Sequence, residues 1–176
     1  MSTELLKRRL DHAFGQLDAD GNGRVERDDL LGLGALILVG FGESPTSAAG
    51  SKLVDGFESV WQALSGEVGD GAISPEEFRT GMSSVLSEDE RFDAVLRPAA
   101  EAVAEMCDTD GDGVVEAAEL RLLLSAFGTP HGEAETAFER LERDRGVSVD
   151  ELVEATRAYY TSVVPGVALA RSAGSL

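Results

Sequence analysis

The segment from Asp108 to Glu119 places oxygen atoms at the spacing that one calcium ion requires. It matches the pattern D-x-D-x-D-G-x(5)-E at every fixed position. Gly113 at loop position 6 permits the sharp turn that this cage needs. The candidate ligands stand at loop positions 1, 3, 5, 7, 9 and 12 and are Asp108, Asp110, Asp112, Val114 through its backbone carbonyl, Glu116 and Glu119. We call this segment the third loop and predict that it binds Ca²⁺.

A second copy of the pattern lies near the N-terminus, from Asp18 to Asp29, and is called the first loop. Its candidate ligands follow the same spacing and are Asp18, Asp20, Asn22, Arg24 through its backbone carbonyl, Glu26 and Asp29. Asp29 stands where the third loop has a glutamate, and the lost methylene group makes a bidentate clamp harder to form. We therefore expect weaker Ca²⁺ binding here than in the third loop, with better tolerance of Mg²⁺.

A damaged copy, the second loop, ends at Glu77. With Glu77 at position 12, Asp70 falls at position 5, but Gly66 and Val68 at positions 1 and 3 offer no side-chain oxygen. A start at Ser65 with one inserted residue improves the first half of the loop, and both alignments remain open. We predict that the second loop binds no ion and serves as a structural partner of the first.

The fourth loop is degenerate in a different way. With Glu151 at position 12, Arg140 falls at position 1 and Arg145 takes the place of the turn glycine, so cationic side chains oppose binding. A deletion would let Glu142 and Asp144 act as first ligands, but it makes the loop too short for a standard cage. We predict that no ion binds here.

Apolar periodicity predicts the helices that flank these loops. Leu6, Leu10 and Leu17 belong to one face of a first helix, and the exit helix from Leu30 to about Phe41 is apolar on several faces, which predicts burial against more than one neighbour. Further apolar stripes predict one helix through Leu53, Phe57, Val60, Trp61 and Leu64, and another through Leu120, Leu123, Leu124 and Phe127.

Helix boundaries are predicted by caps and prolines. Capping patterns at Ser74–Glu77, Ser87–Glu90 and Ser148–Glu151 predict helix starts. Pro98 predicts a kink or a break near Leu96. Gly128 predicts a helix end, and Thr129-Pro130 the start of the next helix. The tail from Pro165 to Leu176 shows no clear periodicity.

Position 8 of each loop is β-branched, which suits a short antiparallel bridge between paired loops. This predicts that Val25 pairs with Ile73 and that Val115 pairs with Val147. The resulting fold is all-α, with four calcium-loop units in two pairs packed into one compact globule. The N-terminal pair comprises residues 1–86, and the C-terminal pair with the tail comprises residues 87–176.

The charge balance restricts the partners. The 176 residues contain 33 acidic and 15 basic residues, a net charge of −18, which would repel nucleic acid and anionic lipid surfaces. Cys107, the single cysteine, excludes an internal disulfide and is expected to be a buried apolar residue. Neither a signal peptide nor an apolar run of membrane-spanning length is evident, so we expect a cytoplasmic location. We also expect a monomer.

The whole chain resembles the calerythrin and sarcoplasmic calcium-binding protein family. The resemblance rests on Asp18–Asp29 ending in aspartate, the insertion-prone Ser65–Glu77, the approach Arg91–Pro98, and Asp108–Glu119. It implies a helical globule of four EF-hands in two packed pairs, and an actinobacterial source. The fourth loop of calerythrin-like proteins usually binds an ion, and Arg140 and Arg145 depart from that pattern.

Three function classes are compatible with a calcium-binding chain, and the sequence favours one. We expect an intracellular Ca²⁺ buffer or signal modulator, in which ion binding mainly stabilises the fold. The alternative is a Ca²⁺ sensor that exposes an apolar groove and regulates a partner protein, but sensors favour Met-rich surfaces and this chain has three methionines. An enzyme is not indicated, because His12 and His131 are isolated and no catalytic motif is present. The sequence indicates no particular protein partner.

Overall fold

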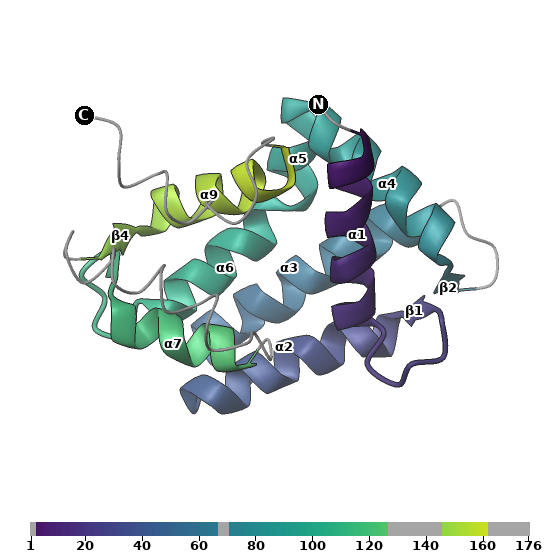
Figure 1. The fold of residues 1–176 in the computed structure, drawn as a ribbon. Coiled ribbons are helices and arrows are strands. Elements are labelled where there is room, and N and C mark those ends of the chain that lie inside the picture. The colour runs from purple at the N-terminus through teal and green to yellow at the C-terminus, as the bar shows by residue number, and fades with distance from the viewer. Residues whose placement is uncertain (1–2, 67–70, 127–145, 162–176) are drawn as a thin grey trace.

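The computed structural model describes residues 3–66, 71–126 and 146–161, and these are mostly helical (Figure 1). This confirms the prediction of a helical chain with short strands. The elements in chain order are α1 (Thr3–Leu17), β1 (Val25–Glu26), α2 (Arg27–Phe41), α3 (Ala48–Ser65), β2 (Ala72–Ile73), α4 (Pro75–Ser87), α5 (Asp89–Val95), α6 (Arg97–Cys107), β3 (Val114–Val115), α7 (Ala117–Ala126), β4 (Val147–Ser148) and α9 (Val149–Thr161).

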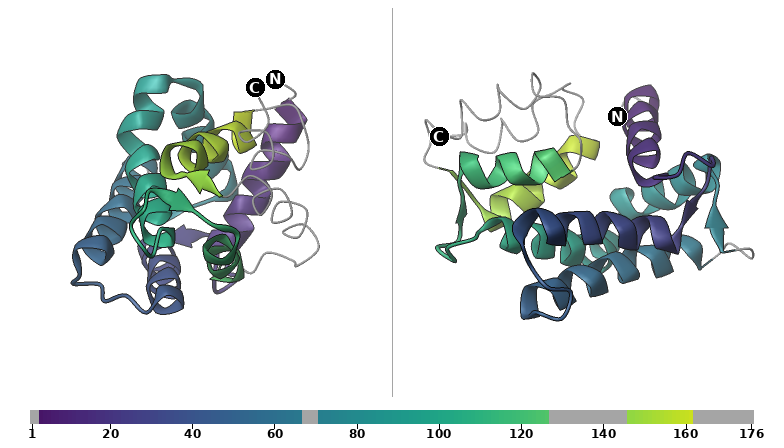
Figure 2. Two further views of the ribbon diagram at one scale, coloured as in Figure 1. Left: turned by 90° about the vertical axis from the view of Figure 1, so that its left-hand side faces the viewer. Right: turned by 90° about the horizontal axis from the view of Figure 1, so that it is seen from below.

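The short strands form two antiparallel pairs at opposite ends of the molecule (Figures 1 and 2). Val25 pairs with Ile73 in β1–β2, and Val115 pairs with Val147 in β3–β4. All four valine and isoleucine side chains are buried. Both predicted position-8 bridges are therefore confirmed. Each bridge joins an intact loop to a damaged one.

The core beneath the β1–β2 pair is built mainly from α1, α3 and α4, with one buried residue each from α2, α5 and α6. Phe14 and Phe78 meet edge to face, with ring centroids 5.6 Å apart and an interplanar angle of 69°. Trp61, from the apolar stripe predicted for α3, is buried in the same cluster. The apolar stripe of α1 thus packs as its periodicity predicts.

A second cluster lies beneath the β3–β4 pair and includes Cys107, Val115, Leu120 and Val153. Phe41, at the end of α2, packs against this cluster and also against a third cluster that contains Ile37, Leu53 and Met106. Because α2 begins at the end of the first loop, it connects that loop to the core beneath the third loop (Figure 1).

The helices α3 and α6 approach closely where small residues face each other. A Cβ atom on Gly56 would lie 2.8 Å from the Cα atom of Ala99. No real side chain tolerates that separation, so glycine at position 56 is required for this packing.

Two of the three predicted helix caps are confirmed. Ser74 caps α4, with Pro75 in the first turn and a reciprocal bond to Glu77. At the start of α9 the Glu151 N–H donates to the hydroxyl of Ser148 at 3.2 Å. The predicted start at Ser87–Glu90 is wrong at its first residue: Ser87 is the last residue of α4, and its hydroxyl donates to the Ser84 carbonyl.

The expected break before Pro98 is present, since α5 ends at Val95 and α6 begins at Arg97. The prediction that α2 is buried against more than one neighbour is confirmed, because α2 packs against both α3 and α7. One face of the helix remains open all the same, with Leu36 and Val39 59% and 79% exposed. Apolar composition alone did not reveal which neighbours the helix would have.

Two arginines form ion pairs between α9 and the helices α5 and α6. Arg97 of α6 bonds Asp93 at 2.7 Å and Glu154 of α9 at 2.6 Å, and these partners raise the pKa of its guanidinium. Arg157 of α9 bonds Asp89, and its guanidinium lies 4.9 Å from the ring centroid of Phe92. These contacts hold α9 against α5 and α6.

Several predictions fall outside the described residues: the helix end at Gly128, the start at Thr129-Pro130, and the tail from Pro165 to Leu176. Of the helices that the structure describes, none combines the length and apolar composition needed to cross a lipid bilayer.

Candidate metal centres

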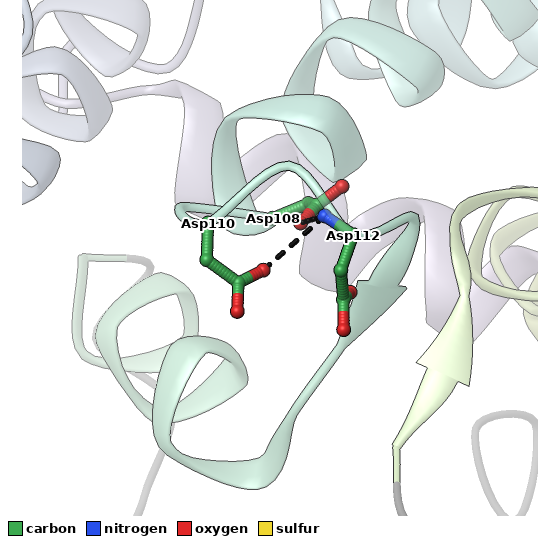
Figure 3. Close-up of side chains that lie close together, drawn as sticks. All are labelled: Asp108, Asp110 and Asp112. Atoms are coloured by element: carbon green, nitrogen blue, oxygen red, sulfur yellow. Dashed lines mark hydrogen bonds between the residues drawn. The ribbon is translucent and has the colours of Figure 1, made fainter.

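The third loop begins where α6 ends and gathers three carboxylates. Oxygen atoms of Asp108, Asp110 and Asp112 all lie within 4.8 Å of one another. Figure 3 shows the three side chains around the turn, with the carboxylate of Asp110 bonded to the backbone N–H of Asp112 at 3.2 Å. The predicted ligands at positions 1, 3 and 5 are therefore close in space.

Backbone N–H groups hold these carboxylates in place. The Gly113 N–H donates to Asp108 at 2.8 Å, and the Val114 N–H donates to Asp112 at 2.8 Å. Gly111 and Gly113 have positive φ values of 75° and 83°, which glycine adopts at little cost. The loop is thus shaped by bonds from its own backbone.

The last predicted ligand, Glu119, reaches back across the third loop. Its Oε1 accepts bonds from the N–H of Thr109 at 2.8 Å and from the hydroxyl of Thr109 at 2.6 Å. Its Oε2 accepts from the N–H of Glu116 at 3.0 Å. The carboxylate therefore connects the start of the loop to its end.

The first loop repeats the bonds of the third. The Gly23 N–H donates to Asp18 at 2.9 Å, and the Arg24 N–H donates to the side-chain oxygen of Asn22 at 2.8 Å. The Asn22 N–H donates to both Asp18 and Asp20 at 3.0 Å. Two segments far apart in the sequence have folded into the same hydrogen-bond pattern.

The two loops differ at position 12. Asp29 accepts a bond from the Glu26 N–H at 2.8 Å, as Glu119 does from Glu116. Within the described residues, no bond joins Asp29 to Ala19, the counterpart of Thr109. The shorter side chain closes only one end of the loop, which is the difference expected from losing a methylene group.

A cationic side chain from the first loop contacts the second loop. The guanidinium of Arg24 donates to the backbone carbonyl of Ala72 at 3.2 Å, and Ala72 occupies position 7 of this loop. Glu77 accepts bonds from the backbone and hydroxyl of Ser74. Val68 and Asp70 lie outside the described residues. The described half of the loop therefore serves strand pairing and helix capping.

In the fourth loop, the described part begins at Gly146. The bonds that Glu151 accepts from the backbone and hydroxyl of Ser148 lower the pKa of its carboxyl group. Gly146 was not predicted to be important. Its φ is 95°, and a Cβ atom built on it would lie 2.8 Å from the carbonyl oxygen of Val115. A glycine directly before the predicted strand was the available signal. Arg140, Glu142, Asp144 and Arg145 lie outside the described residues.

Cys107 directly precedes the third loop but is not arranged as a ligand. It is fully buried, and burial, followed by the charge of Glu119, raises the pKa of its thiol to about 12. A protonated thiol in an apolar cluster is a packing residue, as expected from the sequence.

The donor sets of the first and third loops suit a hard cation. Every candidate ligand supplies oxygen, from carboxylate, amide or backbone carbonyl groups, and Ca²⁺ and Mg²⁺ prefer oxygen. Converging carboxylates repel one another until a cation offsets their charge. The residues present therefore fit a calcium ion in each loop.

Comparison with known proteins supports this assignment. The EF hand family model matches residues 10–33, 69–83 and 105–124, which include the whole first and third loops. Calerythrin from Saccharopolyspora erythraea is 30% identical over 167 residues, covering 91% of this chain and 94% of calerythrin.

Solved structures of similar proteins also support a calcium-binding EF-hand fold. A calcium-binding protein from Streptomyces coelicolor, described as acting in prokaryotic calcium-mediated regulation, is 36% identical with a TM-score of 0.74, covering 89% of this chain and 98% of that chain. The photoprotein clytin is 20% identical with a TM-score of 0.78, covering 96% and 93%, and shows a shared fold alone.

The curated relatives are calcium-binding proteins, in line with the prediction that this chain is not an enzyme. The repeated loop geometry, the family model and the calerythrin match agree with one another. The chain therefore belongs to the calerythrin-like family of EF-hand calcium-binding proteins.

Proposed function

We propose that the first and third loops each bind one Ca²⁺ ion and that the protein is an intracellular calcium buffer or signal modulator. The observation that carries this proposal is the hydrogen-bond pattern that Asp18 and Asp108 share, each accepting bonds from the backbone of its own loop. The proposed ligands are Asp18, Asp20, Asn22, Arg24, Glu26 and Asp29 in the first loop and Asp108, Asp110, Asp112, Val114, Glu116 and Glu119 in the third.

The second and fourth loops complete four EF-hands in two pairs, divided into residues 1–86 and 87–176. This arrangement is supported by the pairing of Val25 with Ile73 and of Val115 with Val147. The hydrogen bond from the Arg24 guanidinium to the Ala72 carbonyl is a further reason to expect no metal in the second loop, because an ion would need the same carbonyl.

Ion binding stabilises the folded chain in this proposal. Free calcium at about a hundred times the dissociation constant adds roughly 2.7 kcal/mol of unfolding free energy per site. The first loop accepts Mg²⁺ more readily than the third, because Asp29 brings a shorter clamp.

A closed buffer is favoured over a sensor that opens. Met82 and Met106 are both 4% exposed and belong to core clusters, so they offer no flexible surface for a partner helix. The sensor remains the second candidate because the Streptomyces coelicolor protein acts in calcium-mediated regulation. The two roles differ in how much apolar surface calcium exposes.

Calorimetric titration with Ca²⁺, followed by fluorescence of a hydrophobic dye, tests the proposal. We expect two bound ions and an unchanged or decreased dye signal at saturation. A strong increase in dye binding on adding calcium would favour the sensor. An absence of calcium binding would overturn both roles.

The setting of this role is proposed to be the cytoplasm, with the protein as a monomer. The buried free thiol of Cys107 suits a reducing compartment. The net charge of −18 opposes self-association and contact with nucleic acid or anionic membranes.

A further inference from the structure

The composition of α2 is unusual for a helix at the surface. From Leu30 to Phe41 no residue carries a polar side chain. Its inner face is explained by the core, where Leu30, Gly34, Ile37 and Leu38 are buried. The outer face has no such explanation, because a solvated helix face is normally polar.

The exposed residues of this outer face form one continuous surface, which we call the α2 stripe. Leu36 and Val39 are the large apolar side chains at its centre, 59% and 79% exposed. The stripe consists of Gly32, Ala35, Leu36, Val39 and Gly40, all exposed. It spans about 12 Å along the helix axis. The helix runs along the lower edge of the molecule in Figure 1.

The shape of the α2 stripe suits a helix. Gly32, Leu36 and Gly40 follow one another at a spacing of four residues and form a single ridge. The glycines on either side of Leu36 leave low points, so the ridge of a second helix can pack closely beside that side chain. A polypeptide helix fits this surface better than a small molecule, which needs a concave site.

The charged residues near the α2 stripe indicate which side chains a partner helix must have beside its apolar face. Asp28 lies four residues before Gly32 on the same face, and Glu43 lies just beyond the helix end. Both are exposed, so the apolar stripe has a carboxylate near each end. A partner helix with cationic side chains at both ends of its apolar face is complementary to this arrangement.

We propose that the α2 stripe is the docking surface for an amphipathic helix of another protein, apolar on one face and rich in Lys or Arg at its edges. A second copy of this chain is a poor occupant, because two molecules of net charge −18 repel each other. The stripe is exposed while the core clusters remain closed, so docking here does not require the opening that defines a sensor. The proposal thus goes beyond the role of buffer.

A model peptide tests the docking surface. The probe is a helical peptide of about 18 residues, roughly 27 Å long, with Leu and Ala on one face and Lys at the edges. Its binding to the full chain is measured by calorimetry in saturating Ca²⁺. We expect binding to weaken at least tenfold in the double variant Leu36→Ser with Val39→Ser. The matched double variant Ala63→Ser with Ala94→Ser, at exposed positions on α3 and α5, should bind within twofold of the wild type.

A second pair of variants tests the charges. Asp28→Asn with Glu43→Gln should weaken binding about two- to fivefold and reduce its salt dependence. Glu76→Gln with Glu90→Gln removes the same net charge at exposed sites on α4 and α5, and should leave binding nearly unchanged. A peptide in which every Lys is replaced by Glu should not bind.

Four results would overturn the proposal. The first is that the wild type does not bind the peptide, and the second is that the Leu36→Ser and Val39→Ser double variant binds it equally well. The third is that the protein self-associates and this double variant abolishes the self-association. The fourth is that the peptide binds only after residues 162–176 are removed. The last two would assign the stripe to a second copy or to the chain's own tail. Counting bound calcium in the same samples separates these failures from a failure of the proposed calcium-binding function.

Discussion

The carboxylate of Glu119 and the backbone N–H of Thr109 are joined by a hydrogen bond of 2.8 Å, although the residues are ten positions apart. This bond brings the last residue of the third loop to its second residue. Asp29, the counterpart of Glu119 in the first loop, bonds Glu26 at 2.8 Å. Glu119 therefore bonds both ends of the third loop, whereas Asp29, shorter by one methylene group, bonds only one end of the first loop.

Replacing Glu119 by glutamine should abolish tight calcium binding at the third loop. Glu119→Gln keeps the oxygen that can accept the bond from Thr109, so the loop can retain its shape while losing the charge that clamps the ion. Calorimetric titration should show one bound ion instead of two. Glu76→Gln, at an exposed position outside the first and third loops, should leave both sites intact. Unchanged binding by Glu119→Gln would remove Glu119 from the ligand set.

Lengthening Asp29 should change the ion preference of the first loop. Asp29→Glu supplies the reach that Glu119 has, so we expect calcium to gain over magnesium by roughly tenfold, or about 1.4 kcal/mol. The measurement is a calcium titration against a fixed background of Mg²⁺. Asp28→Glu is the control, because Asp28 is outside the proposed ligand set. Equal ion preference in Asp29→Glu and the wild type would contradict the role assigned to side-chain length.

Much of this arrangement was predictable because it depends on local rules. The loop pattern placed Asp18 and Asp108 at position 1 of their loops, where both accept backbone bonds, and the β-branched residues at position 8 identified the strand partners Val25 and Ile73. Pro98 marked the break between α5 and α6, because proline has no N–H to continue the hydrogen bonds of α5 and is tolerated in the first turn of a helix, where α6 places it.

The features that escaped prediction depend on contacts distant in sequence. The exposure of Leu36 and Val39 follows from where other helices pack, which the composition of α2 does not encode. Ser87 is a local exception, because its hydroxyl bonds the Ser84 carbonyl in the turn before it instead of capping the next helix. The requirement for Gly146 arises from the nearby backbone of Val115, which the chain reaches only after folding.

Two glycine substitutions should have opposite effects on stability. Gly56→Ala places a methyl group against the backbone of Ala99 and should cost about 1 to 3 kcal/mol of unfolding free energy. Gly15→Ala lies in α1 with no atom within 4 Å of its new Cβ and should gain about 0.5 to 1 kcal/mol. Urea unfolding measures both. Equal stability of the two variants would contradict the close packing of α3 on α6.

The thiol of Cys107 should report on calcium binding. Since its pKa is raised to about 12 and the side chain is fully buried, alkylation at neutral pH requires the protein to open. Calcium at about a hundred times the dissociation constant should slow labelling roughly a hundredfold for each site that opening disrupts.

An exposed thiol provides the control for this labelling experiment. Ser59→Cys in a Cys107→Ala background should react rapidly and at the same rate with or without calcium, because Ser59 is exposed on α3. Rapid labelling of Cys107 in the calcium-loaded protein would show that the core beneath the third loop is more open than its packing indicates.

The most direct test is the number of calcium ions bound at saturation, counted by equilibrium dialysis in the wild type and in a double variant that carries Asp18→Ala and Asp108→Ala. These substitutions remove the first ligand of each intact loop and the backbone bonds that it accepts. We expect two ions in the wild type and none in the double variant. No ion in the wild type, or any ion retained by the double variant, would contradict the assignment of calcium binding to the first and third loops.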